Sequence, residues 1–320
     1  MSKKKYFIIT IDTEGDNLWA WKKGDEIKTE NTLFLPRFQT LCDKYSFKPV
    51  WLSNWEMIND ERYVGFVRRV QDEGRGEIGM HLHAWNTPPL YDLEASDNPG
   101  APYLIEYPDD VMNAKIETMT RIISEKTGVK PVTHRAGRWA TDERYFDLLY
   151  AHGYRVDCSV TPHVDWSETP GETGGLKGSD YSSRGETAYR VKGEKSILEV
   201  PVTIIKSHRL FSPTFKTARG ILSNIYHTAL GNELWLRPDG TNLERMLYIV
   251  DKVSEDERKD YLMFMLHSSE LMPGGSPTFR TEESIEKLYK DLEVLFEKVS
   301  HAADGITLRD YEALKRNENE

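Results

Sequence analysis

The amino-acid sequence predicts an α/β barrel, on the basis of three observations. Apolar segments typical of buried strands alternate with helix-like stretches along the 320 residues. Such alternation implies parallel strands joined by helical crossovers, and about seven or eight such units suggest that the sheet closes. Three apolar segments, at residues 7–14, 77–83 and 262–267, end in acidic residues or histidine. Because α/β barrels build active sites at the C-terminal ends of their strands, these segment ends predict an enzyme.

The individual elements are predicted from local patterns. Strand-like segments lie at about residues 6–12, 48–53, 77–83, 132–137, 154–160, 197–205, 261–268 and 305–308. Helix-like stretches lie at about residues 33–45, 60–73, 109–127, 141–152, 242–257 and 281–302. Pro108 and two aspartates precede the helix at 109–127, and Gly128 follows its end. In the helix at 281–302 the apolar residues recur with a period of about 3.6, which indicates one buried face.

Residues 1–320 are interpreted as one domain, since an α/β barrel commonly has this length. Two long irregular stretches interrupt the alternation, at residues 85–108 and 161–196. The first follows a strand that ends in two histidines, and the second follows the predicted strand of Asp157. Both are therefore expected at the face that carries the polar strand ends, where long loops are usually binding loops or disordered segments. Aromatic residues of the first loop could stack on sugar rings or anchor the loop.

Composition excludes several classes of function. The formal net charge is −10 and no basic face is evident, so a nucleic-acid partner is not expected. Cys42 and Cys158 are too few and too far apart for a disulfide framework or a thiolate metal site. The sequence shows no apolar segment of signal-peptide length and no membrane span, so the expected compartment is the cytoplasm.

Alternation along the strands brings the polar strand ends together. Asp12 and Glu14 share one face of their strand, and His81 and His83 share one face of theirs. With His267 at the end of a third strand, two carboxylates and three imidazoles could converge on one pocket. Carboxylate and imidazole groups are ligands of zinc and related divalent metals, so the sequence predicts a metal site.

Five short segments, taken in order, resemble the motif series of the polysaccharide deacetylases, carbohydrate esterase family 4. They are Asp-Thr-Glu-Gly-Asp at 12–16, Glu-Ile-Gly-Met-His at 77–81, Arg-Ala-Gly-Arg-Trp at 135–139, Asp-Cys-Ser at 157–159 and Leu-His at 266–267. The resemblance covers nearly the whole chain. It is greatest to divergent members from bacterial lipopolysaccharide O-antigen gene clusters, which share the segment Leu-His-Ser-Ser-Glu-Leu-Met-Pro-Gly-Gly at 266–275. The resemblance implies a distorted (β/α) barrel with about seven parallel strands and a divalent metal, usually zinc.

The resemblance assigns Asp12 as the catalytic base, a carboxylate that takes a proton from water beside the metal. The common family pattern places a metal-binding aspartate at the next position, where this chain has Thr13. Divergent members place the metal carboxylate two positions on, which corresponds to Glu14. Strand alternation independently favours Glu14, because it shares the face of Asp12.

His81 matches the first histidine of the second motif, a metal ligand in the family. The usual second histidine lies four residues later, where this chain has Trp85, which becomes a candidate substrate-binding residue. His83 offers a substitute, since an i, i+2 pair on a strand also brings two imidazoles to one metal. Three possibilities stay open: His83 binds the metal, His83 binds only substrate, or the site has lost its metal.

His267 matches the late family histidine that protonates the leaving amine, and Arg135 matches the arginine that orients the catalytic base. Arg138 and Trp139 of the same segment are candidate substrate-binding residues, with Trp139 as a pocket wall. Asp157 joins this group because it resembles the family aspartate that helps to position the pocket's histidine. A structural ion pair is the alternative for Asp157.

The leading hypothesis is a metal-dependent deacetylase that removes the N-acetyl, or another N-acyl, group from a sugar during O-antigen biosynthesis. Nucleotide-linked and lipid-linked forms of the N-acylated sugar are both open as substrates. The alternative is a non-catalytic sugar-binding pseudoenzyme on the same barrel, suggested by Thr13 and Trp85 at positions where the family has metal ligands.

Overall fold

The computed structural model describes residues 4–93, 102–173, 178–191, 197–209 and 231–318. The predicted loops at 85–108 and 161–196 are therefore described in part. Their residues 94–101, 174–177 and 192–196 lie outside the described residues.

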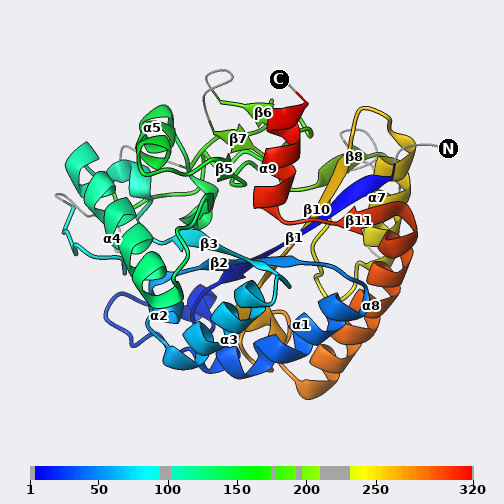
Figure 1. The fold of residues 1–320 in the computed structure, drawn as a ribbon, viewed down its shortest axis with the longest axis horizontal. Coiled ribbons are helices and arrows are strands. Elements are labelled where there is room, and N and C mark those ends of the chain that lie inside the picture. Colours follow the sequence, from blue (N-terminus) through cyan, green and yellow to red (C-terminus); the bar gives the residue numbers. More distant parts are fainter. Residues whose placement is uncertain (1–3, 94–101, 174–177, 192–196, 210–230, 319–320) are drawn as a thin grey trace, which may run out of the picture.

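A curled, mostly parallel sheet forms the centre of the molecule (Figure 1). Seven strands run parallel in the spatial order β10, β1, β2, β3, β4, β5, β7. They are β1 (Lys5–Thr13), β2 (Pro49–Ser53), β3 (Glu77–Leu82), β4 (Thr133–Ala136), β5 (Val156–Asp157), β7 (Leu198–Glu199) and β10 (Tyr261–His267). The short β11 (Ala303–Gly305) pairs in parallel with the start of β1, and β6 (Tyr189–Arg190) pairs antiparallel with β7. The predicted distorted (β/α) barrel with about seven parallel strands is confirmed.

Helices follow most strands and form an arc around the outside of the sheet, with α4, α3, α1 and α8 side by side in Figure 1. They are α1 (Leu35–Lys44), α2 (Trp55–Ile58), α3 (Glu61–Asp72), α4 (Asp109–Thr127), α5 (Glu143–Ala151), α7 (Leu243–Glu255), α8 (Glu282–Ala302) and α9 (Leu308–Asn317). Side chains cap several of them: Asp142 accepts the backbone N–H of Tyr145, and Thr281 accepts that of Ser284. Within the described residues, no helix is both long enough and apolar enough to cross a membrane.

Single hydrogen bonds, rather than a strand ladder, join the two ends of the sheet in the described part of the chain. A hairpin of β8 (Ile204–Ser207) and β9 (Asn232–Trp235) lies near this seam. The backbone N–H of Thr203 donates to the carbonyl of Met263 at 3.3 Å, and that of Met265 donates to the carbonyl of Leu236 at 3.4 Å. Residues on either side of the hairpin, Thr203 and Leu236, are therefore hydrogen-bonded to β10.

The single strand predicted at 197–205 is wrong, because this segment contributes β7 to the main sheet and the start of β8 to the hairpin. Pro201 lies between the two strands. Proline has no N–H to donate to a ladder, so a strand ends there and the chain can change sheets. Strands β6 and β9 and helices α2 and α9 were not predicted.

Alternating side chains of the sheet face two separate cores. On β1, Phe7, Ile9 and Ile11 pack in the cluster that contains the helix residues, whereas Ile8 packs in the barrel interior. The polar Asp12 follows the interior face of this alternation. The same rule places the polar ends of β3 and β10 at one mouth of the barrel.

Candidate metal centre and active site

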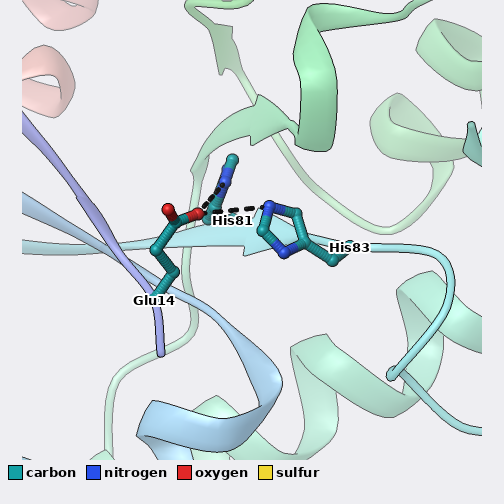
Figure 2. Close-up of side chains that lie close together, drawn as sticks. All are labelled: Glu14, His81 and His83. Atoms are coloured by element: carbon teal, nitrogen blue, oxygen red, sulfur yellow. Dashed lines mark ion pairs between the residues drawn. The ribbon is translucent and has the colours of Figure 1, made fainter. Parts of the chain in front are cut away.

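A carboxylate and two imidazoles meet at the ends of β1 and β3. Glu14 Oε2 lies 3.5 Å from His81 Nε2 and 3.3 Å from His83 Nε2, and Figure 2 shows the carboxylate pointing at both rings. All three side chains are buried, and their potential ligand atoms lie within 4.8 Å of one another. One oxygen and two nitrogen donors at this spacing suit a divalent metal such as zinc. The described residues thus fit the metal that the sequence predicts.

The neighbours of the two histidines decide which ring nitrogen is available to a metal. His81 Nδ1 lies 3.0 Å from the carbonyl oxygen of Arg135, which can only accept, so Nδ1 carries the proton and Nε2 presents a lone pair. His83 Nδ1 lies 2.8 Å from the side-chain amide nitrogen of Asn54. Asn54 Oδ1 accepts the backbone N–H of Trp55 at 2.6 Å. A metal on His83 Nε2 leaves the ring proton on Nδ1, and a half-turn of the Asn54 amide then presents Oδ1 to that proton.

Asp12 and Arg135 form a buried ion pair beneath the pocket. Arg135 on β4 donates from Nη1 to Asp12 Oδ1 at 2.6 Å and from Nη2 to Thr10 Oγ1 at 2.9 Å. Its Nε donates to the carbonyl oxygen of Cys158 at 3.0 Å, and the guanidinium is fully buried. Burial raises the pKa of Asp12, but the Arg135 charge and two nearby histidines outweigh it and leave this pKa below its ordinary value. Asp12 is therefore ionised at neutral pH.

His267 completes the polar cluster. Strand pairing places it directly opposite Asp12, and its Nε2 lies 3.8 Å from Asp12 Oδ2 and 3.9 Å from Glu14 Oε1. On the other side of the ring, Nδ1 lies 3.2 Å from Oε2 of the buried Glu270. Arg237 Nη2 lies 3.1 Å from Glu270 Oε1 and 3.1 Å from His267 Nδ1. Glu270 and Arg237 thus fix the ring so that Nε2 faces the two acids.

The Glu270 carboxylate keeps its charge despite burial. Burial raises its pKa, but Arg237, His267 and the His267 backbone N–H outweigh this effect and bring the pKa to about 2. A permanently ionised carboxylate beside Nδ1 complements a protonated His267 ring.

These groups open into a cavity of about 680 Å³, referred to below as the main cavity. Its polar walls are Asp12, Glu14, His81, His83 and His267; its aromatic walls are Trp19, Trp21, Trp85, Trp139 and Trp166; and its cationic walls are Lys22, Lys23, Arg138 and Arg237. Indole faces are typical of sites that bind sugar rings, because each offers a large rigid apolar platform.

Three of the four predicted substrate-binding residues line the main cavity. Trp85 stacks on His83 with ring centroids 4.2 Å apart, and Trp139 lies over Arg135. Arg138 and Trp139 both adopt left-handed backbone conformations, with φ of 56° and 66°. Such conformations are strained for residues with a Cβ and are concentrated at functional sites.

The loop that carries Trp85 is held from below by a buried lysine. Lys115 on α4 is fully buried and donates to the backbone carbonyls of Ala84, Thr87 and Pro89. These three hydrogen bonds from one ammonium group hold the loop against α4.

Asp157, the fourth predicted substrate-binding residue, does not line the main cavity. It faces away from the barrel interior, and its Oδ1 lies 2.5 Å from His134 Nδ1 while Oδ2 accepts the backbone N–H of Ser159. All three residues are buried. The structure therefore places Asp157 in a buried hydrogen bond with His134, whose pKa is lowered by burial, and not beside His267.

No family model matches the chain, and a search of curated proteins gives no significant match. The fold is similar to that of a solved structure described as a polysaccharide deacetylase from Mycobacterium smegmatis, with a TM-score of 0.56, 15% identity and coverage of 100% of this chain and 92% of that one. It is also similar to a 4-alpha-glucanotransferase from Thermococcus litoralis, with a TM-score of 0.54, 13% identity and coverage of 97% and 40%. A GH57 branching enzyme from Thermococcus kodakaraensis has a TM-score of 0.52, 13% identity and coverage of 97% and 71%.

Proteins of different activities thus share this fold. The reaction must be argued from the site, because the same barrel supports more than one chemistry.

Sequence reasoning missed Asn54, Glu56, Arg237 and Glu270. The first two follow β2, so the rule applied to the other strand ends would have found them. Glu56 accepts the backbone N–H of Gly15 at 2.8 Å and the amide of Asn86 at 2.5 Å, and burial raises its pKa to about 7. Arg237 had no such signal, because strand β9 before it was not predicted.

Proposed function

We propose that this chain is a metal-dependent deacetylase that hydrolyses the N-acetyl, or another N-acyl, group of a sugar. The observation that carries the proposal is the convergence of three groups of side chains on one tryptophan-lined cavity. They are the Glu14, His81 and His83 donor set, the Asp12–Arg135 pair, and His267.

Each group of side chains has a separate role in amide hydrolysis. Glu14, His81 and His83 would hold a divalent metal, which supplies a Lewis acid for the acyl carbonyl and lowers the pKa of water. Asp12, kept ionised by Arg135, takes a proton from the attacking water. The water oxygen bonds to the acyl carbon, the carbon–nitrogen bond breaks, and His267 Nε2 gives a proton to the departing amine.

The arrangement of the acids favours hydrolysis of an amide over transfer of a glycosyl group. Glycoside chemistry uses two carboxyl groups that flank the scissile bond, one of which must be protonated. Asp12 and Glu14 instead approach the same nitrogen of His267, and Asp12 is held ionised. Asp12 therefore does not supply the protonated carboxyl group that glycoside chemistry requires.

The proposal extends to zinc as the metal and to bacterial surface polysaccharide (O-antigen) biosynthesis as the setting. Both rest on the resemblance of the motif series, and the second rests mainly on the segment at 266–275.

The decisive experiment is metal analysis of protein purified without chelator. We expect about one equivalent of divalent metal in the wild-type protein and its loss in Glu14→Ala and His81→Ala, because each removes one of three ligands. His301→Ala serves as the matched control, since this histidine lies exposed on α8. Deacetylation of a panel of N-acylated sugars should follow metal content.

Wild-type protein that takes up no metal even with excess zinc would contradict the deacetylase. It would support the sugar-binding pseudoenzyme.

The role of Glu270 can be tested separately from the metal. We expect Glu270→Gln to lower kcat for amide substrates by about 10- to 100-fold, because the residue positions the proton donor His267. Activated aryl esters expel a leaving group that needs no proton, so their hydrolysis should fall much less. Measuring both rates in Glu270→Gln and in the exposed control Glu257→Gln checks this. Equal losses for both substrate types would show that Glu270 is only structural.

A further inference from the structure

The chain segment that follows β2 lies between the two segments that carry the candidate metal ligands. Strand β2 is hydrogen-bonded to β1 on one side and to β3 on the other. Its last residue, Ser53, pairs with Thr13 and with Met80. Glu14 comes directly after Thr13, and His81 comes directly after Met80. Side chains on the residues after Ser53 can therefore reach both sides of the donor set.

Glu56 on α2 connects these two sides. Its Oε1 accepts the backbone N–H of Gly15 at 2.8 Å, and its Oε2 accepts the side-chain amide of Asn86 at 2.5 Å. Gly15 directly follows the candidate ligand Glu14, and Asn86 lies on the loop beyond β3, shortly after the candidate ligand His83. One carboxylate thus links the backbone beside one ligand to the loop that follows another.

The backbone at Gly15 is packed closely against this carboxylate. A Cβ at this position would lie 3.2 Å from Glu56 Oε1 and 2.1 Å from Cγ2 of Ile27. A contact as short as the second is excluded by van der Waals repulsion, so only glycine fits between Glu56 and the Ile27 side chain. The turn after Glu14 can therefore approach Glu56 closely enough for the hydrogen bond.

The alternative interpretation is that Glu56 serves only its own helix. An acid in the first turn of a helix complements the positive end of the helix dipole, and Glu56 occupies such a position in α2. This helix has only four residues, however, and the two carboxylate oxygens accept from residues 41 and 30 positions away in the chain. The contacts of Glu56 are therefore mainly with other elements.

A second residue of the same segment also contacts both sides of the donor set. The backbone N–H of Asn54 donates to the carbonyl of Thr13 at 3.0 Å, and its side-chain nitrogen lies 2.8 Å from His83 Nδ1. Residues 54–56 thus hold one ligand segment through its backbone and the other through a ring and a loop.

We propose that Glu56 is a positioning residue of the metal centre, which sets the distance between Glu14 and His83 by holding Gly15 and Asn86. The inference rests on the proposed function, because the spacing matters only if a metal binds the donor set. Glu56 is not itself a member of that set.

The test measures the affinity for zinc and for cobalt(II) by competition with a chelator. We expect Glu56→Ala to weaken metal binding by about 10- to 100-fold, the usual effect of removing a hydrogen-bond partner from the surroundings of a metal site. The visible spectrum of bound cobalt should also change, because it depends on the coordination geometry. A residue that only stabilises the fold would lower the resistance of the chelator-treated protein to urea and leave this spectrum unchanged.

A conservative variant separates position from charge. Glu56→Gln should keep most of the metal affinity, because its carbonyl can accept the N–H of Gly15 and its amide can donate to Asn86 Oδ1. That oxygen is buried and has no hydrogen-bond partner among the described residues. Asn86→Ala should weaken binding less than Glu56→Ala does, since the bond to Gly15 remains. The double variant should bind metal about as weakly as Glu56→Ala alone, because both changes remove the same link.

Glu61→Ala is the matched control. Glu61 also lies in the first turn of a helix, α3, but its side chain is 80% exposed and pairs with Lys126. Its loss should change neither the metal affinity nor the cobalt spectrum.

The possible results distinguish this inference from the proposed function. Unchanged affinity and spectrum in Glu56→Ala, or equal losses in Glu56→Ala and Glu56→Gln, would overturn the inference and leave the deacetylase standing. If Glu56→Ala does not fold, wild-type metal affinity in Asn86→Ala would overturn it equally. Metal binding that depends on Glu56, without hydrolysis of any N-acylated sugar, would refute the deacetylase and leave the inference standing. Wild-type protein that binds neither metal would refute both.

Discussion

Asp12→Asn is expected to lower kcat for deacetylation by about 10²- to 10⁴-fold, the usual contribution of a general base. Asparagine keeps the shape of the side chain but cannot take a proton from water. Metal content should not fall, because Asp12 is not one of the three predicted ligands. Steady-state kinetics together with metal analysis of the same preparations would check both statements, with the exposed Asp165→Asn as control.

Two other results for Asp12→Asn would contradict the role assigned to Asp12. An Asp12→Asn protein with wild-type turnover would show that another group is the base, and Glu56 would be the first to examine because its pKa is about 7. Loss of the metal in Asp12→Asn would instead make Asp12 a ligand.

Arg135→Met is expected to lower the free energy of unfolding by about 3–5 kcal/mol, because it leaves the buried carboxylate of Asp12 without its partner. Thr10 Oγ1 and the Cys158 carbonyl also lose a donor. Urea unfolding monitored by tryptophan fluorescence measures the change. Arg37→Met, which removes an exposed pair with Glu286, should change stability by less than about 1 kcal/mol.

A double variant separates the ion pair from simple packing. Asp12→Asn combined with Arg135→Met contains no buried unpaired charge, so it should be more stable than Arg135→Met alone. A double variant that loses the sum of the two single effects would contradict this account. Removing Arg135 also raises the pKa of Asp12, since its charge is the largest influence that lowers this pKa. Residual activity of Arg135→Met should therefore fall away at a higher pH on the acid side than that of the wild type.

Local pattern was enough to predict most of the barrel. The strands β1, β3 and β10 follow from local apolar runs and alternation. The helices α1, α3, α4, α5, α7 and α8 follow from local periodicity, helix caps and glycine. The prediction of a single strand at 197–205 was wrong because the apolar run continues through Pro201, which has no N–H to donate to a neighbouring strand. Strand β9 could not be found, since its partner β8 and the closing contacts depend on residues distant in sequence.

In the candidate site, too, local pattern predicts which face a side chain occupies but not which distant residue it contacts. Glu14, His81 and His83 meet because strand alternation, which the sequence shows, decides their faces. Asp157 was placed with the substrate because its motif suggested it, yet the structure pairs it with His134. Which histidine an aspartate reaches is a matter of tertiary packing. The partner of His267 turned out to be Glu270, three residues along the chain and held by Arg237 from another element.

The seam between the ends of the sheet has an evolutionary consequence. Segments beside the β8–β9 hairpin are joined to β10 by isolated hydrogen bonds, such as that from the Thr203 N–H to the Met263 carbonyl. Mutation or recombination can therefore change the length of the hairpin without breaking the strand pairs of the main sheet. Glu14, His81 and His83 lie on β1 and β3 or just beyond them, outside the hairpin, so changes in the hairpin would leave this donor set in place.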